Sequence, residues 1–365
     1  MLENLYAQNL FIGPDEISID SPTYFIADIA ANHDGDLERA KDLIWKAKEA
    51  GANAAKFQHF EASTIVSDKG FKQLNINSHQ SKWDKSVFEV YKNASVSLDW
   101  TPELKSTCEK AGITFFTSPY AFDLVDAIDP FVPAYKIGSG DITWINLIKH
   151  IASKGKPYIL ATGASTLEDV IRAVSAGLEK NNKIALLQCN TNYTGSIENM
   201  RYVQLNVIKT YAKLFPGMVL GLSDHTPGFT TVLGAISLGA RIVEKHFTDD
   251  ITRLGPDHAF SMDPVSWSDM ILRSRELEAS LGNGVKNIES NEYETVILQR
   301  RAVRFNKNFS LGHIVCEDDL EMLRPCPKNA LSPHQASLLL GVELKRDVEK
   351  GDHALITDID NQCII

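Results

Sequence analysis

Eight short apolar runs, each ending in polar residues, alternate with segments of helical period over residues ~20–285. The runs are FIADIAANH (25–33), AAKFQHF (54–60), ITFFTSP (113–119), AYKIGSGD (134–141), YILATGAS (158–165), IALLQCNTNY (184–193), VLGLSDHT (219–226) and RIVEKHFT (241–248). Among the segments between them, LERAKDLIWKAKEAGA places its apolar residues on one helix face, after a D-G-D start and before a Gly51 stop. Eightfold strand–helix alternation predicts a (β/α)8 TIM barrel, which typically takes ~250 residues. A doubly wound open sheet is the alternative, but eight runs that all end polar fit a closed barrel better, with its active site at the carboxyl ends of the strands.

Composition and charge narrow the class of protein. The 365 residues are 44% hydrophobic and 23% charged, as in ordinary globular proteins, and the net charge of -10 argues against a nucleic-acid partner. The five cysteines are odd in number and scattered, without a CxxC pair, which favours reduced thiols in a cytoplasmic protein. The N-terminal MLENLYAQNL lacks the pattern of a signal peptide, and no apolar run approaches the ~20 residues that span a bilayer. We therefore expect a soluble, cytoplasmic protein with no membrane partner.

The alternation ends near residue 285, which predicts a second domain. We expect a barrel at 1–285, a polar linker at 286–300 and a small β-rich module at 301–365. Within the module, KNFSLGHIVCEDDL (307–320) and RDVEKGDHALITDI (346–359) form a weak internal repeat, which predicts two hairpin-like units. A module of this size suits an oligomerisation or lid element, and we expect it to contribute to a site across a dimer.

Two histidines follow the seventh and eighth strands, in S-D-H (223–225) and E-K-H (244–246). Neighbouring strands lie ~4.8 Å apart, so His225 and His246 can meet on one divalent cation. A histidine at a strand end often only caps a carbonyl group, but two on adjacent strands, beside Asp224 and Glu244, favour a metal. Such a pair suits Mn²⁺, Fe²⁺, Co²⁺ or Zn²⁺ better than Mg²⁺.

Three lysines, Lys56, Lys136 and Lys245, lie within strand runs, where a lysine is seldom buried without a charged partner. If all three point to the barrel mouth, they form a trap for an anion, with further donors from Ser139, Ser165 and Ser223. A Schiff-base lysine, as in barrel aldolases, and lysines that merely extend to solvent are the alternatives.

Other polar residues at the predicted mouth are candidates for catalysis or sugar binding. Asp28 interrupts an apolar run, so it is either a catalytic acid or base or the structural partner of Lys56 on the next strand. In the G-P-D-H loop (255–258), Asp257 and His258 could hold sugar hydroxyls, and Tyr193 in N-T-N-Y could contact a polar ligand. Arg324 is a cation of the small module that precedes a proline-bounded loop.

The runs IADIAANHDGD, AAKFQHF, FFTSPY, YKIGSGD, ILATGAS, GLSDHTPG, VEKHFT and GPDHAFSMDP, in this order, resemble the sialic acid synthase family. The resemblance covers essentially the whole chain and implies that the small module is the family's antifreeze-like (SAF) domain. It implies a metal-dependent condensation of phosphoenolpyruvate with an N-acetylmannosamine-type aldose, which gives a nine-carbon 2-keto-3-deoxy acid and phosphate by C–O cleavage. Mn²⁺ is the expected metal, with Mg²⁺, Co²⁺ and Fe²⁺ as alternatives.

Matched residue by residue, the resemblance implies metal ligation by His225 and His246. It implies phosphoenolpyruvate contacts from Lys56, Lys136, Ser139 and Ser223. We expect Asp28, Lys56 and Lys136 to be catalytic, with Asp28 as the acid or base. It places Tyr193, Asp257 and Arg324 against the sugar, with Arg324 reaching over from the partner in a domain-swapped homodimer.

The chain departs from the family pattern at several positions. Asp28 stands where the family usually has Glu, Ala161 stands where it usually has Ser, and the loops NYTGS and RPCPKNALSP differ from the family's acceptor loops. The acceptor therefore stays open among N-acetylmannosamine, its 6-phosphate and diacetamido-trideoxy hexoses, with G-P-D-H favouring the first. Alternative functions are a synthase that gives an eight-carbon product, a Schiff-base aldolase and a non-catalytic sugar-binding protein.

Overall fold

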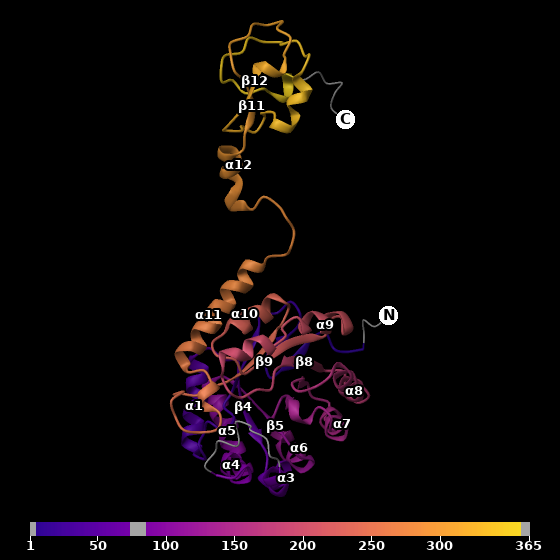
Figure 1. Ribbon diagram of the computed structural model, residues 1–365, viewed down its shortest axis with the longest axis vertical. Helices are drawn as coiled ribbons and strands as arrows, with labels where there is room; N and C mark the ends of the chain where they lie inside the picture. The colour runs from indigo at the N-terminus through magenta and orange to yellow at the C-terminus, as the bar shows by residue number, and fades with distance from the viewer. Residues whose placement is uncertain (1–4, 74–84, 359–365) are drawn as a thin grey trace. The chain divides into compact units, whose positions relative to one another are not determined.

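Eight parallel strands close into a barrel in the computed structural model, which describes residues 5–73 and 85–358. Around the barrel the strands follow one another in chain order, and the last, β10, pairs with the first, β3 (Figure 1). The strands are β3 (Tyr24–Asp28), β4 (Ala54–His59), β5 (Thr114–Pro119), β6 (Tyr135–Ile137), β7 (Tyr158–Ala161), β8 (Ile184–Cys189), β9 (Val219–Asp224) and β10 (Ile242–His246). Seven lie within predicted runs and β3 begins one residue before its run, so the predicted TIM barrel is confirmed.

Helices cover the outside of the barrel, and α6, α7 and α8 follow one another around it (Figure 1). The outer helices are α1 (Leu37–Glu49), α5 (Thr101–Ala111), α6 (Phe122–Ile128), α7 (Ile145–Ser153), α8 (Leu167–Leu178), α9 (Val207–Leu214), α10 (Thr230–Ser237) and α11 (Pro264–Leu281). The predicted D-G-D start of α1 is a true N-cap, because the Asp36 side chain accepts hydrogen bonds from the backbone N–H groups of Glu38 and Arg39. Apolar residues of α1 are buried against the strands, which are themselves buried on both faces.

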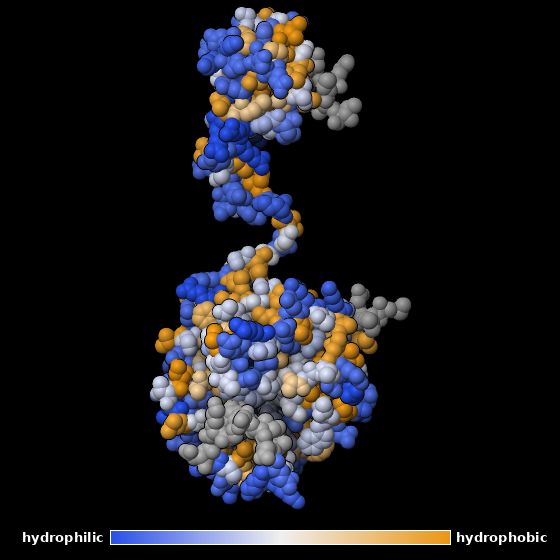
Figure 2. All heavy atoms as spheres, viewed as in Figure 1, coloured by the Kyte–Doolittle hydropathy of each residue, from blue (hydrophilic) through white to orange (hydrophobic). Residues whose placement is uncertain are grey.

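Two additions distinguish this barrel from a minimal one. A short antiparallel hairpin of β1 (Leu10–Ile12) and β2 (Asp15–Ile17) precedes the first barrel strand. In its described residues, 60–73 and 85–100, the connection from β4 to α5 carries three extra α-helices, namely α2 (Ala62–Ile65), α3 (Asp68–Gln73) and α4 (Val87–Ala94). Figure 2 shows hydrophobic residues scattered among hydrophilic ones over the face in view, as on an ordinary protein surface.

The chain divides into two units, Met1–Gly282 and Asn283–Ile365. In the described part of the second unit, α12 (Tyr293–Gln299) lies within the predicted linker 286–300, and β11 (Ala302–Phe305) pairs antiparallel with β12 (Leu320–Leu323). A small separate core includes Val303, Phe305 and Leu331. The assignment of this unit as an antifreeze-like domain stays a prediction.

The two sequence repeats of the second unit bridge to each other and to other segments. Residues 307–320 connect β11 to β12, and within them Phe309 and Ile314 form single bridges to Val348 and Glu343. Residues 346–358 instead form single bridges to other segments, such as Val348 with Phe309 and His353 with Arg304, and residue 359 lies outside the described residues. The prediction of a second hairpin is therefore wrong, because this segment gains its backbone partners from the first repeat and its neighbours.

The described residues contain neither a helix that could span a membrane nor a disulfide bond. Over residues 5–73 and 85–358, no helix combines the length and apolar character needed to cross a bilayer. Within the same ranges Cys108, Cys189, Cys316 and Cys326 are free thiols, whereas Cys363 lies outside them.

Successive side chains of β10 point to opposite faces of the strand, one towards the barrel interior and one towards the covering helices. Glu244 and His246 share one face of the strand, and Lys245 has the other. Lys245 Nζ donates to Asp224 Oδ2 at 2.6 Å and to the Thr226 carbonyl at 2.8 Å, and Asp224 also accepts from Thr231 of α10. The predicted place of Lys245 in an anion trap is therefore wrong, because this lysine joins the barrel wall to a covering helix.

We expect Lys245→Met to lower the free energy of unfolding of the barrel by ~3–5 kcal/mol, because Asp224 would be left buried without its cation. Both side chains of this pair are 1% exposed. Urea unfolding followed by circular dichroism measures the change. Lys72→Met is the matched control, since Lys72 pairs with Asp68 on the surface, where an ion pair contributes only ~0–1 kcal/mol. A Lys245→Met protein of unchanged stability would contradict the structural role.

Candidate active site

Two buried ion pairs lie inside the barrel near the carboxyl ends of its strands. Lys56 Nζ on β4 donates to Asp28 Oδ2 on β3 at 2.6 Å, and Lys136 Nζ on β6 donates to Glu244 Oε1 on β10 at 3.0 Å. Lys56 Nζ also lies 3.7 Å from Glu244 Oε1, so the two pairs form one cluster. All four side chains are at most 6% exposed. The cluster spans the barrel interior, because β6 and β10 are not neighbouring strands.

Strand register explains why these residues meet. Asp28 pairs with Lys56 across β3 and β4, and with His246 across β3 and β10. Residues in register on neighbouring parallel strands lie one strand spacing apart, ~4.8 Å, so each inward side chain reaches the next. The predicted partnership of Asp28 with Lys56 is therefore present, and it leaves a catalytic role for the acid open.

Opposite charges sustain one another in this cluster. Burial opposes the charge of Lys56, but Asp28 and Glu244 outweigh burial and raise the pKa of Lys56. For Glu244, burial is likewise outweighed by Lys136 and Lys56, which lower its pKa. For Asp28 the balance goes the other way: burial, the largest effect, and Glu244 raise its pKa, although Lys56 lowers it. The two lysines are thus already matched by two carboxylates, so the predicted cation trap carries no excess positive charge of its own.

The two predicted metal ligands lie beside the cluster with their rings 5.3 Å apart between centroids. His225 Nδ1 lies 3.1 Å from the Asn190 carbonyl oxygen, to which it donates, so its Nε2 is the nitrogen left for a ligand. His246 Nδ1 is buried and has no hydrogen-bond partner among the described residues. Burial and nearby positive charges hold the pKa of His246 well below its usual value, which keeps the imidazole in the neutral form that binds metals.

The donor set fits a metal only in part. Among the described residues, no group of three His, Cys, Asp or Glu side chains is arranged to hold a metal ion. The pair would supply two nitrogen ligands, and His246 also has carboxylates near it, with Nε2 3.8 Å from Asp28 Oδ2 and Nδ1 3.9 Å from Asp257 Oδ2. A cation here would need its remaining ligands from substrate or water, as open catalytic sites do.

A cavity of about 430 Å³ opens beside His246 and is large enough for small-molecule ligands. Its lining includes four predicted residues, Ser139, Tyr193, His246 and Asp257. The Tyr193 ring packs edge-on against His225 at 4.6 Å between centroids. Asp257 Oδ2 accepts from the Ala31 backbone N–H at 3.1 Å, and burial raises the pKa of Asp257 to about 6.

The remaining predicted residues divide between the two units. Ser223 Oγ donates to Glu244 Oε1 at 3.2 Å, so it belongs to the charged cluster, and Ser139 Oγ accepts from the Gly163 N–H at 2.9 Å at the cavity. Arg324 is an exposed residue of the second unit, where its Nε donates to the Gln299 carbonyl at 2.6 Å. Its predicted contact with the sugar across a dimer stays a prediction.

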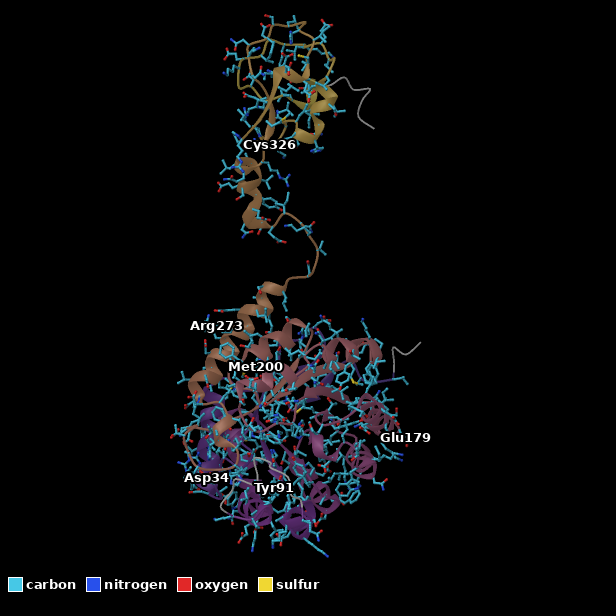
Figure 3. The ribbon with its side chains drawn as sticks, viewed as in Figure 1. Asp34, Tyr91, Glu179, Met200, Arg273 and Cys326 are labelled. Atoms are coloured by element: carbon cyan, nitrogen blue, oxygen red, sulfur yellow. The ribbon has the colours of Figure 1, made fainter. Side chains whose placement is uncertain are left out.

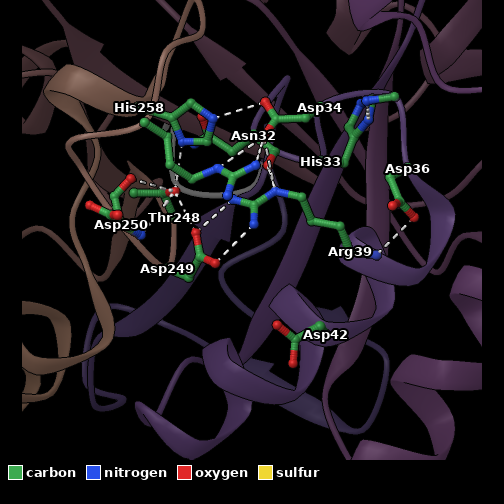
Figure 4. A network of polar contacts seen from close by, with 12 residues as sticks. Asn32, His33, Asp34, Asp36, Arg39, Asp42, Thr248, Asp249, Asp250 and His258 are labelled. Carbon is green, nitrogen blue, oxygen red and sulfur yellow. Dashed lines mark hydrogen bonds and ion pairs between the residues drawn. The ribbon is translucent and has the colours of Figure 1, made fainter.

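His258 does not reach the cavity, so its predicted role in holding sugar hydroxyls is wrong. The ring is fully buried between Thr248 Oγ1 at 2.7 Å and Asp34 Oδ1 at 2.9 Å (Figure 4). In the same network Arg39 donates two hydrogen bonds to Asp249 and one to the Asn32 carbonyl. These contacts fix the β10 loop against the β3 loop, which positions Asp257 next to His258 without exposing the histidine.

Several residues of the site were not singled out from the sequence. Gln58 Nε2 donates to Asp28 Oδ2 at 3.0 Å, and its place two residues after Lys56 on the same strand face was a usable signal. The sequence marked Glu244 only as a neighbour of the histidines, although it is one of the two carboxylates that pair with the buried lysines. Tyr91 lines the cavity from a segment whose proximity no local pattern revealed (Figure 3 labels Tyr91), whereas Asp141 lines it from the polar end of the predicted run 134–141.

Comparison with known proteins identifies the family of the chain. The NeuB family model matches residues 43–286. The N,N'-diacetyllegionaminic acid synthase of Legionella pneumophila is 32% identical over 92% of this chain and 94% of its own length. The pseudaminic acid synthase of Campylobacter jejuni is 32% identical over 91% and 95%. The crystal structure of a sialic acid synthetase from Leptospira borgpetersenii in complex with citrate, 27% identical, covers 80% of this chain and 96% of its own, with a TM-score of 0.70. The chain therefore belongs to the NeuB family.

Proposed function

We propose that this chain is a nonulosonic acid synthase, which condenses phosphoenolpyruvate with an N-acetylmannosamine-type aldose. The observation that carries the proposal is the pair Lys56 and Lys136, held with their carboxylates beside His225 and His246 at the mouth of a NeuB-family barrel. Relatives named as synthases of legionaminic and pseudaminic acids align over more than nine-tenths of the chain, which supports the same class of reaction.

The proposed reaction forms one carbon–carbon bond and breaks one carbon–oxygen bond. Carbon 3 of phosphoenolpyruvate attacks the aldehyde carbon of the open-chain sugar, and the aldehyde oxygen takes a proton. Water adds to carbon 2 and loses a proton, and phosphate leaves as the bond from carbon 2 to the bridging oxygen breaks. The products are a nine-carbon 2-keto-3-deoxy acid and phosphate.

The residues of the site suit separate roles in this reaction. Lys56 and Lys136 stabilise the anionic oxygens of phosphoenolpyruvate and of the tetrahedral intermediate, with Ser139 and Ser223 as neutral donors. Asp28, within reach of both Lys56 and His246, moves a proton to the aldehyde oxygen or from the water. Tyr193 and Asp257 line the cavity in which the sugar would bind.

Charge balance supports a divalent metal, with Mn²⁺ as the proposed ion. The carboxylates Asp28 and Glu244 offset both lysines, and Asp141 and Asp257 add further acidity to the cavity. Phosphoenolpyruvate therefore needs positive charge beyond that of the lysines. Held by His225 and His246, a divalent cation would supply this charge and act as a Lewis acid on the aldehyde.

A Schiff-base aldolase is disfavoured by the same contacts. A lysine nucleophile needs a depressed pKa, whereas Asp28 and Glu244 raise the pKa of Lys56. The domain-swapped homodimer in which Arg324 of the partner contacts the sugar remains part of the proposal.

Phosphate release from phosphoenolpyruvate tests the proposal directly. With Mn²⁺ and an N-acetylated aldose we expect release that EDTA abolishes and Mn²⁺ restores. With ¹⁸O in the bridging position of phosphoenolpyruvate, mass spectrometry should find the label in phosphate. Label retained in the keto acid contradicts C–O cleavage, and pyruvate-dependent trapping by borohydride would indicate the aldolase. Absence of release across a panel of aldoses favours a non-catalytic sugar-binding protein.

We expect Asp28→Asn to lower kcat by ~10²-fold or more, because it removes the charge that pairs with Lys56 and the group that transfers the proton. Asp28→Glu, which restores the longer side chain of the family, should keep or raise kcat. Steady-state kinetics measures both variants.

Asp126→Asn is the matched control, since Asp126 is a half-exposed surface residue that pairs with His150 and Lys154. Its kinetics should not change. An Asp28→Asn protein with full activity but a lowered melting temperature would show that the acid is only structural.

A further inference from the structure

Two carboxyl groups reach the active-site cavity from opposite sides of the barrel. Asp141 ends η4 (Ser139–Asp141), which follows β6, and Asp257 is the N-cap of η6 (His258–Phe260), on the connection that follows β10. Three strands separate β6 from β10 in either direction around the closed barrel. Because both residues line the cavity, a ligand bound there has a carboxyl group on each of two sides.

The carboxyl group of Asp141 takes no part in the charge balance of the lysine cluster. Burial raises its pKa to about 6, and no side chain among the described residues offsets this effect. No Lys or Arg is found among the described residues that line the cavity. A carboxyl group in this setting can hold a proton near neutral pH and give it up, as a general acid must.

Asp257 lies at the reacting end of the cavity. Its Oδ2 accepts from the Ala31 backbone N–H at 3.1 Å and lies 3.9 Å from His246 Nδ1. The backbone contact holds the carboxylate in place beside the histidine. Since the proposed function brings the aldehyde carbon of the sugar to the histidine pair, the oxygen on carbon 1 comes close to Asp257.

The proposed condensation uses an aldehyde, whereas an aldose of this kind is almost entirely a cyclic hemiacetal in water. Opening the ring moves two protons, because the hydroxyl group on carbon 1 loses one and the ring oxygen gains one. A base and an acid on two sides of the sugar are the arrangement that general acid–base catalysis of this step requires.

We propose that the cavity binds the cyclic sugar and opens its ring, with Asp257 as the base and Asp141 as the acid. Asp257 takes the proton of the hydroxyl group on carbon 1, and the electron pair of that O–H bond forms the carbonyl double bond. The bond from carbon 1 to the ring oxygen breaks, and the ring oxygen takes the proton of Asp141. Water returns the two carboxyl groups to their starting forms after each condensation, so no oxidant or reductant is needed.

The inference rests on the proposed function and adds a second activity to it. Ring opening followed by closure exchanges the two anomers of the sugar, so the enzyme should catalyse this exchange without any condensation. The test uses the full chain with Mn²⁺ and 2-phospholactate, which has the charged groups of phosphoenolpyruvate but no double bond. The sugar is N-acetylmannosamine or, if it supports no phosphate release, whichever of its 6-phosphate and the diacetamido-trideoxy hexoses does.

NMR exchange spectroscopy measures the rate at which the anomers interconvert, and phosphate release from phosphoenolpyruvate is measured in parallel. We expect bound sugar to interconvert ~10²–10⁴-fold faster than free sugar. Phosphate release without faster interconversion overturns this inference and leaves the proposed function standing. Faster interconversion without phosphate release supports ring opening and contradicts the condensation. Absence of both with every sugar overturns both.

Substitutions assign the two roles. At saturating sugar, Asp141→Asn and Asp257→Asn should each lower the enzyme-dependent interconversion by ~10²-fold, and Asp141→Glu should restore most of it. Asp123→Asn is the matched control, because Asp123 is exposed on α6, and its rate should not change. Circular dichroism checks that the variants are folded. Folded Asn variants that need more sugar for saturation but keep the full rate would show that the carboxyl groups only bind the sugar, which overturns the inference.

Discussion

Mutual neutralisation of Lys56 with Asp28 and of Lys136 with Glu244 is the constraint around which the barrel interior is organised. An isolated charge in such a place would be lost to a pKa shift, because burial disfavours the ionised form. Strand register brings each lysine to 2.6–3.0 Å from its carboxylate, and these contacts offset part of the cost of burial, although burial still raises the pKa of Asp28. The catalytic candidates are thus also structural residues, and one network of contacts serves both purposes.

That balance determines what else the site requires. A cluster with equal numbers of lysines and carboxylates orients an anionic substrate but attracts it weakly from a distance, and the net charge of -10 does not help. The cluster can therefore orient a bound anion, but another source of positive charge is needed to attract the anion to the site. The histidine pair lies where added positive charge would act on both substrates at once, which is why the metal proposal and the lysine cluster support each other.

Much of the fold follows from local pattern, and so does part of the site. Apolar runs with polar ends predicted all eight strands, because strand residues of such a barrel are buried on both faces and only their tips meet ligands. The sequence also indicates that Lys245 faces away from the barrel interior, because side chains alternate along a strand and its neighbours Glu244 and His246 face inward. The anion trap was predicted from the presence of three lysines in strand runs, which ignores this alternation. His258 could not be placed, because its partners Thr248 and Asp34 come from different loops. The cavity contacts of α4 depend in the same way on tertiary packing.

The three helices inserted between β4 and α5 have a consequence for how such enzymes diversify. The charged cluster is anchored by the hydrogen-bonded register of the strands, whereas Ile65, Val90, Tyr91 and Ala94 of the cavity lining come from a connection that the barrel does not need in order to close. Substitutions in that connection can reshape the cavity lining without moving the side chains that the strands position. The cavity lining and the buried charged cluster can therefore change independently of one another over evolutionary time.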